Sequence, residues 1–205
     1  MNPRVLRRFV FLMAVLTIGA FIFWDVLSEY VTRAPGDFHT DTGSNRLNDR
    51  LYEEALAEFN LALEEASDHR GALMGRALVY IQTERYDDAI AELTYLIGVL
   101  ERTLEAEPDD VTGRGVMAAA YANRGIVHDR QGRYQPALDD YIAAIKIDLG
   151  TVEGPDIFHK IIYGGDHTST VQERAQYLYE QLQLPEEERL MRVPELDAEQ
   201  RMYKP

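Results

Sequence analysis

The sequence predicts an all-α fold, in which one apolar helix precedes a short stack of helical hairpins. Two observations predict this class. An uncharged apolar run of sixteen residues lies near the N-terminus, close to the length of a membrane-spanning helix. Further along, one pattern of aromatic and small residues recurs three times. The offsets from its first residue are 3, 7 and 10, which lie on one face of an α-helix.

The apolar run, FVFLMAVLTIGAFIFW, is the centre of a predicted transmembrane helix. A helix over residues 5–27 can cross a lipid bilayer with its ends in the interface. Arg4, Arg7 and Arg8 precede the run. The positive-inside rule therefore places the N-terminus in the cytoplasm and the rest of the chain on the other side.

A cleaved signal peptide is the competing interpretation of this segment. The run is longer than the usual core of a signal peptide, and no A-x-A type site follows it. We therefore expect residues 1–31 to be an anchor that stays attached. Residues 32–41 are predicted to be a linker, because Pro35 and Gly36 end the helix.

Three stretches carry the recurring pattern: NDRLYEEALAEFNLAL, QTERYDDAIAELTYLI and RQGRYQPALDDYIAAI. Tyr52 and Tyr86 are 34 residues apart, and Tyr86 and Tyr134 are 48 apart, which is 34 plus 14. A fixed period of this length is typical of helix-turn-helix repeats. The aligned positions are Tyr52/Ala55/Phe59/Ala62, Tyr86/Ala89/Leu93/Leu96 and Tyr134/Ala137/Tyr141/Ala144.

The three units, over residues 42–149, resemble tetratricopeptide repeats (TPRs). The second helix of a TPR carries the Tyr, Ala, aromatic, Ala series, and the first carries a small residue among larger ones. His39 and Thr42 stand where the first unit should have bulky residues, so its first helix is predicted to be short or frayed. An ordinary helical bundle with alanine-rich seams is the alternative. The first-helix matches are Gly43, then Leu73, Ala77 and Tyr80, then Tyr121 and Gly125.

The fourteen additional residues fall between the second and third units. Apolar residues continue at helical spacing past Leu93 to Leu104, and Pro108 then ends the helix. Seven extra residues on each of two helices nearly keep the helical phase. We therefore expect a long hairpin over about residues 87–131, which projects about 10 Å beyond its neighbours at 1.5 Å per residue.

The C-terminal part departs from the repeat pattern. Residues 150–184 are expected to form helices that cap the stack, with one short helix at GPDIFHKIIYGG and a capping box at Thr170 and Glu173 that starts another. The tail, residues 185–205, is polar but keeps several apolar side chains. It is either a disordered end or an extended strap across a partner. The candidate partner-binding residues of such a strap are Leu190, Met191, Leu196 and Tyr203.

Composition excludes several functions. The chain has no Cys, which excludes disulfides, c-type haem attachment and thiolate metal sites. Its formal net charge is −14, so its soluble part is not expected to bind nucleic acid. This acidity serves solubility, and it also permits a basic protein partner. No hydrolase, zinc or phosphate-binding motif is present. We expect no enzymatic activity, no cofactor or metal and no small-molecule substrate.

The resemblance also implies where a partner would bind, because the first helices of successive TPR units line a concave groove. TPR domains that clamp a terminal carboxylate need basic or Asn side chains there, and Met74 and Leu78 stand in their place. The groove is therefore expected to take an apolar helix or extended segment, or else to pack against the chain's own tail or first unit. The implied positions are Gly71, Met74, Leu78, Ile81 and Gln82 in the second unit, and Ala119, Ala122, Ile126, Asp129 and Arg130 in the third.

Together these features indicate a protein–protein interaction scaffold of the bacterial cytoplasmic membrane, with its repeats in the periplasm. The first interpretation is an accessory, stabilising or assembly subunit of a larger membrane complex, whose partners are other protein subunits. The alternative is a membrane-anchored periplasmic chaperone that holds client polypeptides during maturation, as some TPR proteins do in cytochrome maturation. A subunit would co-purify at a fixed ratio, whereas a chaperone would capture varied clients.

Overall fold

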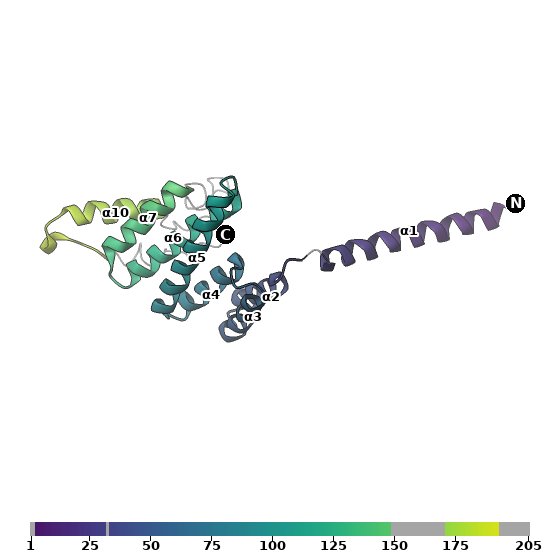
Figure 1. The fold of residues 1–205 in the computed structure, drawn as a ribbon, viewed down its shortest axis with the longest axis horizontal. Helices are drawn as coiled ribbons and strands as arrows, with labels where there is room; N and C mark the ends of the chain where they lie inside the picture. Colours follow the sequence, from purple (N-terminus) through teal and green to yellow (C-terminus); the bar gives the residue numbers. More distant parts are fainter. Residues whose placement is uncertain (1–2, 32, 149–170, 193–205) are drawn as a thin grey trace.

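The structure is a computed structural model that describes residues 3–31, 33–148 and 171–192. The described residues are helical and contain no strand (Figure 1). The predicted helix at 154–165, the predicted cap at Thr170 and the tail beyond Arg192 lie outside these ranges. The elements are α1 (Pro3–Val31), α2 (Asp37–Asn48), α3 (Tyr52–Glu65), α4 (Arg70–Gln82), α5 (Tyr86–Ala106), α6 (Val111–Arg130), α7 (Tyr134–Ile147), α10 (Val171–Gln183) and a 3₁₀ turn at Glu186–Glu188.

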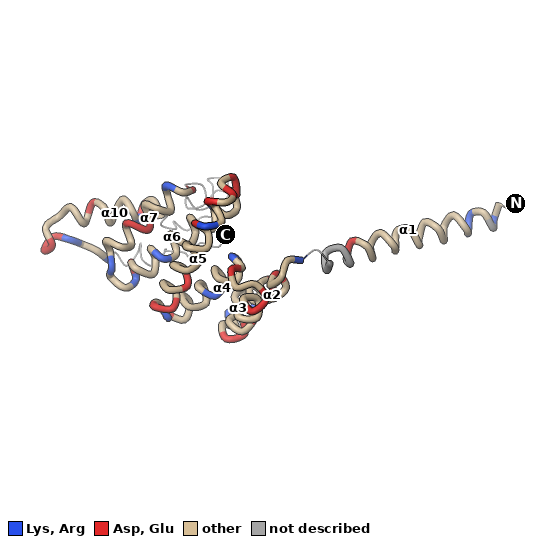
Figure 2. Tube along the Cα trace, viewed as in Figure 1, with Lys and Arg blue, Asp and Glu red and all other residues tan. Residues whose placement is uncertain are grey.

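Helix α1 extends away from the rest of the molecule (Figure 1). Its segment Leu6–Asp25 has a mean hydropathy of 2.0, and none of it is buried in the protein. Charged residues lie only toward its ends (Figure 2). The Thr17 hydroxyl donates to the Met13 carbonyl at 2.8 Å, so this polar group is satisfied within the helix. By length and composition, α1 is able to cross a membrane.

Helices α2 to α7 form three antiparallel hairpins, in which each helix packs against the next along the chain. The helices α5 and α6 have 21 and 20 residues, whereas α3 and α4 have 14 and 13. One hydrophobic core joins the first two hairpins to α6, and a second core joins the third hairpin to α10. Tyr121 packs against both cores, so the stack is continuous.

The turn inside each hairpin is built in the same way three times. Arg50, Glu84 and Gly132 have positive φ angles of 61°, 58° and 74°, and they are 34 and 48 residues apart. In each turn the next residue donates its N–H to a carbonyl five positions earlier, as in Leu51 to Arg46 at 2.9 Å. This left-handed C-cap with a 6→1 hydrogen bond is the Schellman motif. The backbone therefore repeats with the period that the tyrosines indicate.

The first helix of the first unit, α2, is neither short nor frayed. It has 12 residues, one fewer than α4. The polar residues that suggested fraying have partners instead: His39 Nδ1 lies 2.7 Å from Glu58 Oε2, and the Thr42 hydroxyl donates to the Phe38 carbonyl at 2.9 Å. Hydrogen bonds to α3 and within α2 thus replace the apolar contacts that the repeat pattern expects.

The tip of the long hairpin is tied to the start of α4. Asp110 caps α6 by accepting from the Gly113 N–H at 2.8 Å, and it accepts from Arg70 Nη1 at 2.6 Å. The hydrogen bonds from Gly113 and Arg70 lower the pKa of Asp110. A Cβ on Gly113 would lie 2.5 Å from Asp110 Oδ2, so a larger residue at that position would force the Asp110 carboxylate to move.

Candidate partner-binding groove

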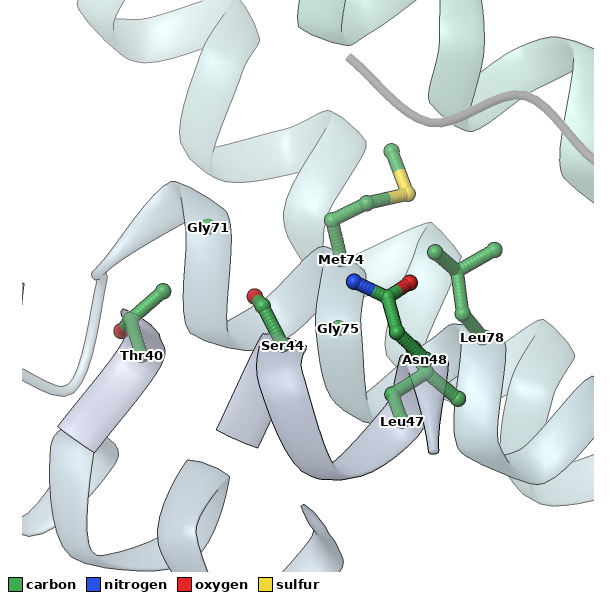
Figure 3. Close-up of a pocket in the computed structure, with 8 residues that line it drawn as sticks. All are labelled: Thr40, Ser44, Leu47, Asn48, Gly71, Met74, Gly75 and Leu78. Carbon is green, nitrogen blue, oxygen red and sulfur yellow. The ribbon is translucent and has the colours of Figure 1, made fainter. Parts of the chain in front are cut away.

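A cavity of about 300 Å³ lies between α2 and α4, the first helices of the first two units (Figure 3). Side chains from both helices surround it, and the backbone of α4 forms part of its wall where two glycines remove the side chains. The lining residues are Thr40, Ser44, Leu47 and Asn48 from α2 and Gly71, Met74, Gly75 and Leu78 from α4.

Two of the residues that the resemblance implied, Met74 and Leu78, line this cavity. The cavity residues on α2 are not among the positions predicted from the sequence, although the 34-residue repeat period identifies them. The implied positions of the second unit are 74, 78, 81 and 82, and subtracting 34 from each gives Thr40, Ser44, Leu47 and Asn48. These are the four α2 residues at the cavity.

The lining carries no charged side chain. Leu47, Met74 and Leu78 supply apolar side chains to the lining, while Ser44 and Asn48 supply a hydroxyl and an amide (Figure 3). An uncharged lining cannot hold a terminal carboxylate by ion pairing. It suits an apolar side chain of a bound segment, while the backbone of that segment makes a few hydrogen bonds to the lining.

A hydrogen-bonded chain fixes one edge of the cavity. His69 Nε2 lies 3.0 Å from Asp37 Oδ1, and His69 Nδ1 lies 3.3 Å from the Thr40 hydroxyl. These residue types also occur in nucleophile–base–acid relays. Here, however, Nδ1 accepts the Ala72 N–H at 3.2 Å and caps α4, so its lone pair is already used. The hydrogen bond from His69 lowers the pKa of Asp37. These hydrogen bonds therefore join α2 to α4 and hold that edge of the cavity in place.

The other two predicted partner-binding residues of the second unit differ in burial. Ile81 is buried in the first core, whereas Gln82 is exposed at the end of α4. Neither of them lines the cavity.

In the third unit, three of the implied groove positions share a core or an ion pair with α10, and Arg130 contacts the segment that follows it. Ala122 and Ile126 are buried in the core that contains Val171, Ala175 and Leu178 of α10. Asp129 is 5% exposed and accepts from Arg174 Nε and Nη2 at 2.7 and 2.8 Å. Arg130 is half-buried, and its carbonyl accepts from Arg192 at 2.8 Å. Among the described residues, the predicted groove positions that line a cavity lie between α2 and α4.

The four tail candidates are placed only in part. Leu190 is 61% exposed, and Met191 is partly buried against the second core. Leu196 and Tyr203 lie outside the described residues.

Within residues 3–31, 33–148 and 171–192, no group of three or more His, Cys, Asp or Glu side chains is arranged to hold a metal ion.

No protein-family model and no curated protein matches the sequence. Among solved structures, the chain is similar to the first TPR domain of Spaghetti (RPAP3), which was solved bound to the HSP90 peptide SRMEEVD. The TM-score is 0.53, the sequence identity is 13%, and the match covers 73% of this chain and 94% of that one. At this identity the likeness concerns the fold alone. The helical hairpins of this chain thus form a TPR fold.

Proposed function

We propose that the protein is a non-catalytic scaffold that binds a segment of a partner protein in the α2–α4 groove. The observation that carries this proposal is the cavity, which lies on the first helices of two TPR units, whereas Asp129 on the same face of the third unit is paired with Arg174 of α10. The structural neighbour binds a peptide, which supports a protein ligand in general.

The chemistry of the groove differs from recognition of an acidic peptide end. The lining offers no Lys or Arg to a carboxylate, and the chain as a whole is acidic, with a net charge of −14. A segment with an apolar side chain for the cavity and no excess of negative charge fits best.

We also propose that α1 anchors the protein in the bacterial inner membrane and that the repeats lie in the periplasm, as part of a larger membrane complex. The length and hydropathy of α1 support the anchor, and the arginines before it support the orientation.

Filling the groove should weaken partner binding without unfolding the stack. Ser44 is exposed at the cavity, so Ser44→Trp places a large ring in the groove at little expense to the core. We expect the amount of partner that co-purifies with the full-length protein from detergent-solubilised membranes to fall at least several-fold, as measured by quantitative mass spectrometry.

Ala57→Trp is the matched control, because Ala57 is exposed on α3 and does not line the cavity. It should leave co-purification unchanged. Equal recovery of partners with both variants would contradict the groove as the binding site. A fixed ratio of one partner set would identify a subunit, whereas many partners at low ratio would identify a chaperone.

The orientation of the anchor has its own test. An alkaline phosphatase fused after Pro205 should be active in bacteria, because this enzyme folds only in the periplasm. Replacing Arg4, Arg7 and Arg8 with glutamate should reduce that activity, since these charges determine the orientation. An active cytoplasmic reporter at the same position would contradict the proposed topology.

A further inference from the structure

We propose that the protein's own tail, residues 193–205, binds in the α2–α4 groove and that a partner must displace it. This inference deepens the proposed function and rests on it for the role of the partner. The tail lies outside the described residues, and residues 184–192 are the described segment that leads into it.

After α10 the chain turns at Glu186–Glu188 and returns along the same helix. The partners of successive residues move backward along α10, from Gln181 through Tyr177 to Arg174, which defines an antiparallel return. The hydrogen bonds are Leu190 N to Gln181 Oε1 at 2.7 Å, the Tyr177 hydroxyl to the Leu190 carbonyl, and Arg174 Nη2 to the Met191 carbonyl at 3.1 Å.

The return delivers the chain to the end of the row of first helices. Arg192 Nη2 donates to the Arg130 carbonyl at 2.8 Å, and Arg130 is the third-unit counterpart of Gln82 and of Asn48. Asn48 lines the cavity. The segment therefore leaves the described structure two repeat steps from the groove, at the corresponding end of the helices.

The available length is sufficient for the tail to reach the cavity. Packed helices are about 8–10 Å apart, so two repeat steps amount to roughly 20 Å. From Arg192 to Tyr203 is eleven residues, which span up to about 36 Å when extended.

The chemistry of the tail complements the groove. Met202 and Tyr203 are large side chains of mainly apolar surface, and the cavity lining is uncharged and partly apolar. Arg201 and Lys204 flank them, and residues 37–148 carry twice as many acidic as basic side chains. Glu195, Asp197 and Glu199 stand earlier in the tail, so the attraction to the acidic repeats is confined to residues 201–204.

Self-occupancy would regulate partner binding by mass action. A partner can enter only the fraction of molecules whose groove is open, so its apparent dissociation constant rises in inverse proportion to that fraction. Removing the tail should thus strengthen partner binding by the same factor.

Cysteine cross-linking of the full-length protein tests the placement directly, because the chain has no native Cys. In detergent, Ser44→Cys combined with Tyr203→Cys should form an intramolecular disulfide under mild oxidation, identified by mass spectrometry of the linked peptides. Ala57→Cys combined with Tyr203→Cys should link at least tenfold more slowly. Equal rates for the two pairs would overturn the proposal, and so would links between two chains, which would make a second copy the occupant.

A binding assay provides the second arm. A fluorescent peptide of residues 193–205 should bind the chain truncated after Arg192, and binding to the Ser44→Trp form of that truncated chain should be at least tenfold weaker. Failure of the peptide to bind the truncated chain would contradict the inference. These measurements use purified protein alone, so they can succeed even when Ser44→Trp leaves co-purification unchanged. That combination would refute the partner site and keep the tail site.

Discussion

Replacing Arg174 with glutamine is expected to lower the free energy of unfolding of the repeat stack by about 3–5 kcal/mol, the usual effect of removing one partner of a buried ion pair. Arg174 is 3% exposed and Asp129 is 5% exposed. The variant leaves the Asp129 carboxylate in the protein interior without its guanidinium. The measurement is urea unfolding of the full chain in detergent, followed by circular dichroism at 222 nm.

Two further variants control for the loss of side-chain packing. Asp129→Asn together with Arg174→Gln removes both charges of this pair, and the introduced amide can still accept from the Tyr141 hydroxyl, which lies 3.2 Å from Asp129 Oδ2. The double variant should recover most of the lost stability. Arg46→Gln breaks an exposed pair with Glu54 and should have little effect. A double variant no more stable than Arg174→Gln would show that packing, not charge, holds α10.

The Asp129–Arg174 pair illustrates what could be predicted from the sequence and what could not. The repeat period predicts that Asp129 is a groove position. It does not predict that Asp129 pairs with another residue of the same chain. Its partner Arg174 lies in a helix outside the repeats, 45 residues away, so only the folded chain brings the two together. The sequence therefore predicts which face of α6 lines the groove, but not that Asp129 on this face pairs with Arg174 of α10.

Residues that follow the period were predictable, and residues that depend on cross-unit contacts were not. The 34-residue spacing predicts the hairpins. The same spacing, subtracted from the numbers of Met74 and Leu78, also identifies Thr40 and Ser44 on the α2 side of the cavity. The intact first helix was not predictable from His39, because its stability depends on Glu58 in the next helix. Gly75 is another such case, since it contacts a side chain of the preceding unit.

Phe59 occupies a slot between two glycines, and this arrangement leads to the second large prediction. Phe59 is fully buried. A Cβ on Gly75 would lie 2.2 Å from Phe59 Cζ, and one on Gly43 would lie 2.8 Å from Phe59 Cε1. The third unit repeats the pairing, with Gly125 against Tyr141, whereas the second unit pairs the larger Ala77 with the smaller Leu93.

Phe59→Ala is expected to lower the free energy of unfolding by about 3–5 kcal/mol, because the glycines on either side cannot fill the space that the ring leaves. Gly75→Ala in the parent should lower it by about 1–3 kcal/mol through overpacking against the ring. In the Phe59→Ala background the same Gly75→Ala should instead raise stability. The clash is then absent, and alanine favours the helix over glycine by about 1 kcal/mol. The decisive result is this reversal of sign in a double-mutant cycle measured by urea unfolding.

Gly98→Ala serves as the matched control, since its Cβ would meet only the Arg102 side chain at 3.7 Å, and it should stabilise α5 equally in both backgrounds. If Gly75→Ala destabilises both backgrounds to the same extent, Phe59 is not what requires glycine there, and the contact between the first two units must be assigned to other residues.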